Sequence, residues 1–270
     1  MNRIFSSLDS NAIEVSFIIP VKFDPRVIEC TKKIKEYASS RAITAEVLVC
    51  GRLEHNMIPQ DIWFIEVDPP DKGSCVRAGV LASRGHVIVV IDADLPVLLT
   101  DLDKLLLAAE NADVVFGNRY LPSSSIPDSR LSIRFFASRI FRILVQNLFQ
   151  LKGFDTQCGV KALRQSSKEM LFNYLLIKGL AYDVELALRA KLLGFSVAQI
   201  PVHLQRSSNS TICIWHAIPT IAKEVFRLYY NFKLKRCIRW SGISEGQIQT
   251  SNKRSVSPSV GLNTSHFTKP

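Results

Sequence analysis

Residues 86–96 read HVIVVIDADLP, and this stretch carries the main information on the fold. The run of Val and Ile over Val87–Ile91 is typical of a strand that is buried on both faces. Asp92 and Asp94 follow the strand, and their i, i+2 spacing predicts that both carboxylates point to the same side. Such a pair is costly without a cation, and Mg²⁺ or Mn²⁺ carrying a phosphate would meet that need. A solvated turn is the structural alternative.

The composition limits the class of protein. The 270 residues are 47% hydrophobic, which suits one large domain or a domain with an appendage. A net charge of +10 favours phosphorylated or anionic partners, with a basic surface for solubility as the alternative. The six scattered cysteines favour reduced, buried thiols over a disulfide framework or a zinc site. Without an apolar leader or a run of about 18 apolar residues, the chain is expected to be cytoplasmic and at most peripheral on a membrane.

Strand and helix patterns alternate along the first 117 residues. The expected strands are Glu14–Pro20, Ala45–Cys50, Ile62–Val67, Val87–Ile91 and Asp113–Gly117. The expected helices are Asp24–Ser39, Gly73–Ser83 and a third one through Ala109, for which Thr100 and Asp103 resemble a capping box. This alternation predicts an α/β fold with a mostly parallel central sheet and helices on both faces.

The second half of the chain is expected to be mainly helical. The expected helices cover residues 129–151, 166–175, 180–193 and 214–234, and one strand covers residues 196–202. The pattern divides the chain into an N-terminal extension (1–13), a catalytic domain (14–205), an amphipathic C-terminal segment (206–240) and a disordered tail (241–270). The last helix suits a membrane interface, or packing on the domain, equally well.

Ligands bind beyond the carboxyl ends of the strands in such a sheet, so Pro20, Asp92 and Asn118 are expected to share one crevice. Asp71–Gly73 opens a helix, where glycine and lysine favour a phosphate. Arg119 follows a strand and offers a planar guanidinium to a phosphate. An ordinary turn and a surface arginine are the structural alternatives.

Two helices add further charged candidates. A polar stripe without acidic neighbours lies on the long helix, and it consists of Arg130, Arg134, Ser138 and Arg142. This stripe favours an anionic ligand or lipid headgroups over a merely solvated face. Asp183 and Glu185 lie in an otherwise apolar helix, where unpartnered acids are rarely tolerated. They are therefore candidates both for the site and for structural ion pairs.

Taken in order, seven motifs within residues 14–235 resemble family 2 glycosyltransferases of the GT-A fold. The closest resemblance is to the polyprenyl- and dolichyl-phosphate mannose and glucose synthases. The motifs are FIIPV (17–21), DKGSCVRAG (71–79), DADLP (92–96), GNRY (117–120), Arg134-x-x-x-Ser138, DTQCGVKALR (155–164) and YDVEL (182–186). An isolated DxD is a weak signal, whereas the ordered set is specific to the superfamily.

The resemblance implies a nucleotide-sugar donor of the GDP-mannose or UDP-glucose type, a Mg²⁺ or Mn²⁺ ion and a polyprenyl-phosphate acceptor, in glycolipid biosynthesis. Asp92 would face the donor, Asp94 would hold the metal with it, and Asp155 would line the sugar pocket and help to orient the reactants. The implied donor-binding residues are Pro20, Val21, Lys72, Gly73, Arg77, Asp92 and Gln157. The implied acceptor-phosphate ligands are Arg119, Arg134 and Ser138.

Three departures from the family pattern lie around the donor site. Lys22–Asp24 stands where an Asn-Glu pair is usual, Cys50–Arg52 replaces paired aspartates, and Pro96 replaces a glutamine. Donor recognition is therefore expected to differ from that of the family.

One alternative function is a family 2 enzyme acting on a saccharide hydroxyl, with Asp155, Asp183 or Glu185 as general base. The other is a relative that binds a nucleotide sugar or a partner without turnover. Nucleic-acid binding rests only on net charge, so no nucleic-acid partner is expected.

Overall fold

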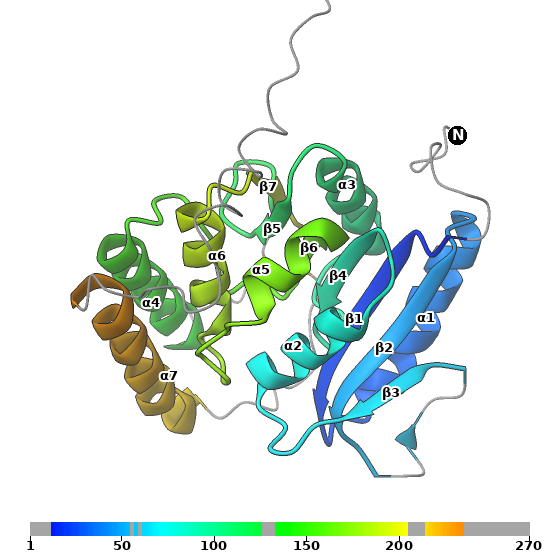
Figure 1. Cartoon of the computed structure of the whole chain (residues 1–270), viewed down its shortest axis with the longest axis horizontal. Helices are drawn as coiled ribbons and strands as arrows, with labels where there is room; N and C mark the ends of the chain where they lie inside the picture. The colour runs from blue at the N-terminus through cyan, green and yellow to red at the C-terminus, as the bar shows by residue number, and fades with distance from the viewer. Residues whose placement is uncertain (1–11, 55–56, 59–60, 126–132, 205–213, 235–270) are drawn as a thin grey trace, which may run out of the picture. The chain divides into compact units, whose positions relative to one another are not determined.

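A seven-stranded mixed sheet forms the centre of the computed structural model (Figure 1). The structure describes residues 12–54, 57–58, 61–125, 133–204 and 214–234, with the backbone alone over 133–138, 214–218 and 233–234. The strands are β1 (Val15–Lys22), β2 (Ala45–Arg52), β3 (Trp63–Glu66), β4 (Val87–Ile91), β5 (Val114–Asn118), β6 (Val160–Arg164) and β7 (Val197–Pro201). Their order is β3-β2-β1-β4-β6-β5-β7, and β6 alone runs antiparallel to its neighbours.

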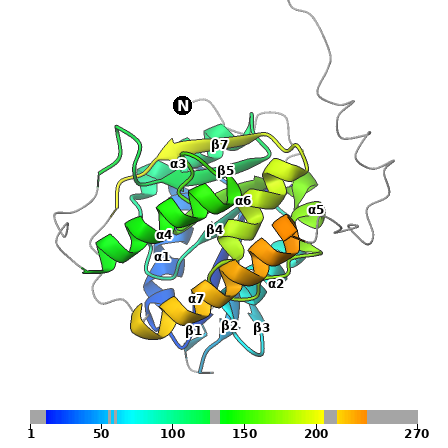
Figure 2. The ribbon, with the colours of Figure 1, turned by 90° about the vertical axis from the view of Figure 1, so that its left-hand side faces the viewer.

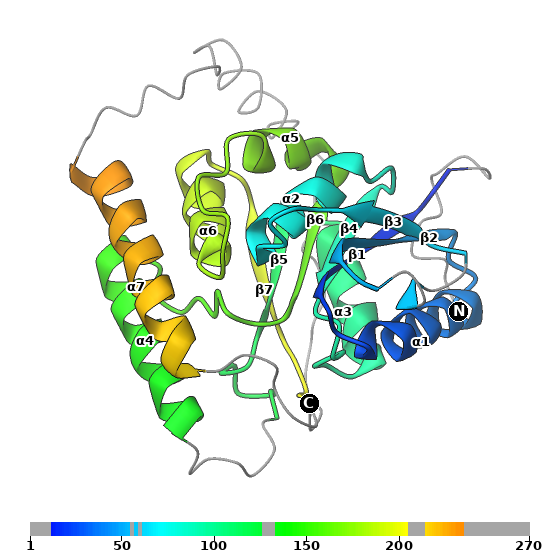
Figure 3. The same cartoon turned by 90° about the horizontal axis from the view of Figure 1, so that it is seen from below.

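Helices cover both faces of this sheet, as the sequence predicted (Figure 3). The helices are α1 (Arg26–Ser40), α2 (Lys72–Ala82), α3 (Leu99–Ala109), α4 (Ile133–Phe149), α5 (Lys168–Phe172), α6 (Tyr182–Leu192) and α7 (Ile214–Tyr229). One apolar core lies beneath α1 and α3, and a second lies beneath the other helices. Alternate residues of β4 enter the two cores, so the Val and Ile run is buried on both faces, as expected.

Strand β6 is the element that the sequence reading missed. It pairs with β4 through Val160–Ile91 and with β5 through Leu163–Val114. A lysine at the second position of this five-residue strand masks its apolar pattern, and Lys161 is tolerated there because it is ion-paired in the interior. The expected helix over 166–175 is also shorter, because a 3₁₀ turn at Gln165–Ser167 precedes α5.

The expected capping box at the start of α3 is wrong. The cap position is Leu98, and no side chain caps this helix. Asp103 instead accepts hydrogen bonds from the Tyr37 hydroxyl at 2.7 Å and from Arg41 at 2.8 and 3.0 Å. The carboxylate is therefore used to join α3 to α1, a long-range contact that a local motif cannot reveal.

Helices α4 and α7 lie side by side at one end of the sheet (Figure 2). Val225 and Leu228 of α7 are buried in the same core as Val145 and Phe149 of α4. The described residues belong to one compact unit, Met1–Arg236, so the C-terminal helix is packed on the α/β domain. The tail expected over 241–270 lies outside the described residues.

Candidate active site at the carboxyl edge of the sheet

The Asp92–Asp94 pair lies in a tight turn directly after β4. The Leu95 amide donates to the Asp92 carbonyl at 2.9 Å, and Leu95 has a positive φ of 45°. Strand alternation therefore does not set the directions of the two carboxylates, because β4 ends at Ile91 and Asp94 lies in the turn. Both carboxylates still reach solvent, with about a quarter to a third of each side chain exposed (25% for Asp94 and 30% for Asp92).

A lysine from the start of α2 lies against the first of these carboxylates. The Lys72 ammonium is 2.8 Å from Oδ1 and 3.0 Å from Oδ2 of Asp92. Burial of the ammonium favours its neutral form, but the charges of Asp92 and Asp183 outweigh burial and raise the pKa of Lys72. Lys72 is therefore a cation at neutral pH, as its expected role beside a donor phosphate requires.

An arginine from the start of α1 faces the second carboxylate. The Arg26 guanidinium binds Asp24 through two hydrogen bonds of 2.6 and 2.9 Å, and its Nη1 lies 3.7 Å from Oδ2 of Asp94. Hydrogen bonds from Arg26 lower the pKa of Asp24, although burial opposes them. The sequence pattern predicts Asp24 mainly as the start of a helix, and it gives no prediction for Arg26. The signal was available, because Asp24 stands where the family pattern differs.

Two residues expected in different parts of the site, Asp155 in the sugar pocket and Arg119 at the acceptor phosphate, form an ion pair with each other. Oδ2 of Asp155 accepts from Nε and the backbone amide of Arg119 at 2.7 and 3.0 Å, and Oδ1 accepts from Nη2 at 2.8 Å. Asp155 is buried. The Arg142 guanidinium stacks 3.7 Å above the Tyr120 ring, next to Arg119, and its buried Nε has no hydrogen-bond partner among the described residues.

The two acids of α6 have different surroundings. Glu185 accepts hydrogen bonds from Arg189 and from the amides of Leu176 and Ile177, so its contacts all hold the fold together. Asp183 lies 2.9 Å from the Lys161 ammonium in the interior. That ammonium also donates to the Cys158 carbonyl at 2.6 Å. Asp183 is thus a structural ion-pair member whose charge also acts on Lys72.

Several other expected donor ligands have packing contacts. Arg77 donates to the carbonyls of Phe172 and Asn173 at 2.8 and 3.0 Å, which joins α2 to α5. Pro20 and Val21 are buried in β1. Gly73 packs closely, because a Cβ there would lie 2.7 Å from the Lys178 carbonyl oxygen. Gln157 differs from these, since its buried Nε2 has no partner in the described part of the chain. The side chains of Arg134 and Ser138 lie outside the described residues.

The unusual end of β2 has a packing explanation. Gly51 has a φ of 143°, and a Cβ there would lie 1.8 Å from the Val21 carbonyl oxygen. Cys50 is fully buried in the core, where a Cβ on Gly79 would meet its Sγ at 2.7 Å. The aspartates usual at this place in the family would therefore not fit this backbone.

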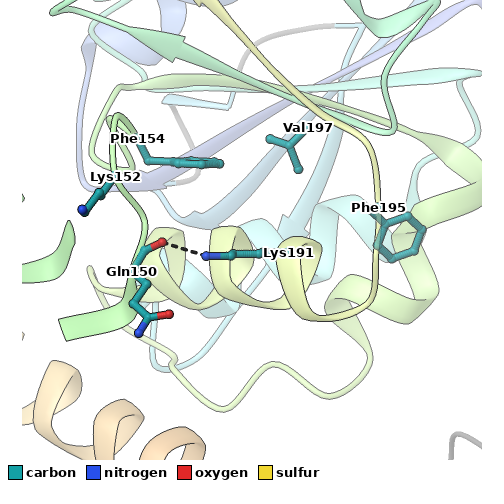
Figure 4. A pocket seen from close by; sticks show the side chains of 6 residues that line it. All are labelled: Gln150, Lys152, Phe154, Lys191, Phe195 and Val197. Carbon is teal, nitrogen blue, oxygen red and sulfur yellow. Dashed lines mark hydrogen bonds between the residues drawn. The ribbon is translucent and has the colours of Figure 1, made fainter. Parts of the chain in front are cut away.

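Two cavities in the described structure lie away from the aspartate turn. One, of about 610 Å³, is lined by Gln150, Lys152, Phe154, Lys191, Phe195 and Val197. Figure 4 shows Lys191 donating to the Gln150 carbonyl across it, at 2.7 Å. The other, of about 700 Å³, lies near Trp63 at the opposite end of β2 from Gly51. Neither is lined by Asp92 or Asp94.

The aspartate turn fits a divalent metal that is held partly by its ligand. Among the described residues, no group of three or more His, Cys, Asp or Glu side chains is arranged around a metal position. Asp92 and Asp94 would supply two carboxylates, and a bound diphosphate and water would complete the oxygen ligands. Gly159 leaves room beside them, because a Cβ there would lie 2.9 Å from Oδ2 of Asp92.

Comparison with known proteins connects this geometry to a family. Residues 70–172 match the model for Glycosyl transferase family 2. Similar proteins include three dolichyl-phosphate beta-glucosyltransferases. The protein from Dictyostelium discoideum is 28% identical over 60% of this chain and 52% of its own length, and the one from Mus musculus is 36% identical over 52% of this chain and 46% of its own length. The protein from Drosophila melanogaster is 28% identical over 84% of this chain and 78% of its own length. The chain spans about half the length of the first two.

A solved structure has the same fold. The glucosyl-3-phosphoglycerate synthase of Mycobacterium tuberculosis in complex with uridine diphosphate is 15% identical, with a TM-score of 0.59 over 82% of this chain and 80% of that chain. At this identity the likeness establishes the fold alone. Together with the mostly parallel seven-stranded sheet, it confirms the expected GT-A fold.

Proposed function

Because residues 70–172 match the family 2 glycosyltransferase model and the fold matches that of a solved glucosyltransferase-type structure, we propose that the chain transfers a hexose from a nucleotide sugar to a polyprenyl phosphate. The observation that carries this proposal is the Asp92–Asp94 turn with Lys72 beside it, within the residues that match the family. Relatives named dolichyl-phosphate beta-glucosyltransferase support this class of acceptor.

The reaction fits an inverting single displacement. A lipid phosphate carries roughly 1.5 to 2 negative charges near neutral pH, so its oxygen can attack the anomeric carbon without a strong base. The pairing of Asp155 with Arg119 is compatible with this route, because Asp155 is then needed for orientation and not for proton removal. Lys72 would bind the donor diphosphate, and Mg²⁺ or Mn²⁺ at Asp92 and Asp94 would neutralise the charge on the departing nucleotide.

Polar atoms that have no hydrogen-bond partner among the described residues support two binding regions. Gln157 Nε2 lies two residues from Asp155 in sequence and would bind the sugar of the donor. Arg119 and the Arg134–Ser138 motif of α4 would hold the acceptor phosphate. The stacked Arg142, whose Nε has no hydrogen-bond partner in the part of the chain that the structure describes, adds positive charge on the same helix as that motif.

A membrane surface is the proposed place of the reaction, on the cytoplasmic side. In the described residues, no helix has the length and apolar character needed to span a bilayer. Helices α4 and α7 lie side by side (Figures 2 and 3). Large apolar side chains are exposed on these two helices and on the π-helical turn Tyr230–Leu234 that follows α7, namely Ile140, Ile143, Leu144, Phe226 and Tyr230. We name this set the α4–α7 apolar face, and it suits a helix pair that lies in the interface plane.

The test is an acceptor comparison with a panel of nucleotide sugars. Purified protein with Mg²⁺ or Mn²⁺ receives a polyprenyl phosphate, the matching polyprenol without phosphate, or an oligosaccharide. We expect one donor to give a glycolipid with the phosphate acceptor alone. Transfer to the oligosaccharide without transfer to the lipid phosphate would instead support the saccharide-acting alternative. Calorimetric donor binding without any product would support a binding protein without turnover.

A further inference from the structure

Each carboxylate of the aspartate turn already has a cation from the fold itself. Lys72 lies 2.8 Å from Asp92, and Arg26 lies 3.7 Å from Asp94. Among the ion pairs of the described residues at this turn, Asp24, Asp92 and Asp94 carry three negative charges against the two positive charges of Lys72 and Arg26, a net charge of −1. A site that recruited free divalent cations would be expected to carry a larger negative surplus.

The arginine is held firmly in this position. Asp24 binds its Nε and Nη2 in a bidentate pair and also accepts from the Arg26 backbone amide at 3.1 Å. Asp24 is itself buried, so the anchor is shielded from competing water. A divalent ion on Oδ2 of Asp94 would therefore meet a fixed like charge a few ångströms away.

We propose that Arg26 is a resident cation that weakens divalent metal binding at Asp94 in the ligand-free protein, so that the metal is held tightly only together with the donor diphosphate. This inference rests on the metal site of the proposed function and concerns its regulation. The diphosphate supplies the negative charge that offsets Arg26, so the binding of metal and of diphosphate becomes coupled and each strengthens the other.

The experiment is a Mn²⁺ titration of the ligand-free full chain, followed by electron paramagnetic resonance of the free ion. The decisive variant is Asp24→Asn/Arg26→Gln, which removes one charge of each sign and leaves the net charge unchanged. We expect its Mn²⁺ dissociation constant to fall roughly tenfold, as loss of a partly screened like charge implies. With uridine diphosphate added as a diphosphate probe, the Mn²⁺ dissociation constants of this variant and of the wild type should become more similar.

The matched control is Asp103→Asn/Arg41→Gln, at the other end of α1. Arg41 binds Asp103 in the same bidentate way, at 2.8 and 3.0 Å. This control should leave Mn²⁺ binding unchanged. If the decisive variant does not fold, Arg26→Gln alone should move the constant in the same direction.

An unchanged or weaker Mn²⁺ affinity on removal of Arg26 would overturn the inference. Mn²⁺-dependent glycolipid formation in that case would leave the proposed function intact. An absence of Mn²⁺ binding in every variant, with and without uridine diphosphate, would remove the metal site and this inference together.

Discussion

Charged side chains around the site are paired across long distances in sequence. Asp155 is paired with Arg119, and Asp183 is paired with Lys161. Buried charges require such partners, because an uncompensated ion in the interior is strongly unfavourable. The sequence identified the acids as noteworthy, but it could not identify their partners, since no local pattern links residues that are 36 positions apart.

Glu46 on β2 gives a prediction about pH at the residue scale. Burial disfavours its charged form, but hydrogen bonds from Ser16 and Arg84 outweigh burial and lower its pKa below 4.5. Its contribution to stability is therefore present above the unfolded pKa and is lost as pH falls through the lower folded pKa. We expect Glu46→Gln to flatten the fall in unfolding free energy below about pH 4.5.

Urea denaturation of wild type and Glu46→Gln between pH 3 and 7 checks this expectation. The difference in stability should be about 1–3 kcal/mol at neutral pH and should shrink in acid. Parallel pH profiles for the two proteins would contradict the expected ion pairing of Glu46.

At the scale of elements, the sequence predicted the alternating first half well and the second half less well. Strands with continuous apolar runs, such as β4, have a strong local signal. Strand β6 does not, because the ion-pair partner of its buried lysine, Asp183, lies on α6. The partners that make the strand favourable become visible only in the folded chain.

The Lys161–Asp183 pair joins β6 to α6 and can be tested by a double replacement. Lys161→Met leaves the Asp183 carboxylate buried without its cation, so we expect a loss of about 3 kcal/mol in unfolding free energy. Lys161→Met/Asp183→Asn removes the stranded charge and should recover part of that loss. Urea denaturation measures both values. Equal stability for the single and double variants would contradict a coupled pair.

For the whole molecule, the sequence predicted the sheet, its helical layers and the aspartates at its carboxyl edge. It also identified the last helix as amphipathic, but it left two alternatives for its apolar side. Both alternatives keep support, because one side of α7 is buried against α4 while Phe226 of α7 and Tyr230 of the turn that follows it are exposed. Pairing of two helices separated by more than sixty residues has no local signature.

The α4–α7 apolar face leads to a prediction about membrane binding. Ile140→Ser/Phe226→Ser removes two side chains that are 66% and 67% exposed, so folding should be little affected. We expect at least about tenfold weaker sedimentation with vesicles that contain anionic lipid, because each apolar side chain contributes roughly 1.5–3 kcal/mol when fully buried.

The matched control for this experiment is Leu107→Ser/Tyr174→Ser, which changes exposed side chains on α3 and after α5. This control should bind vesicles as the wild type does. Equal loss of binding in both double variants would show that the α4–α7 apolar face has no special part in it.

The most direct test of the proposed hexose transfer is the amount of labelled sugar that enters the lipid extract from polyprenyl phosphate and a panel of labelled nucleotide sugars with Mn²⁺. The wild type should form a glycolipid with one donor, and Asp103→Asn should retain this activity. Asp94→Asn should lose at least about a hundredfold of it while keeping its melting temperature, because it removes charge stabilisation at the leaving diphosphate. No lipid product with any donor, or full turnover by Asp94→Asn, would contradict the account.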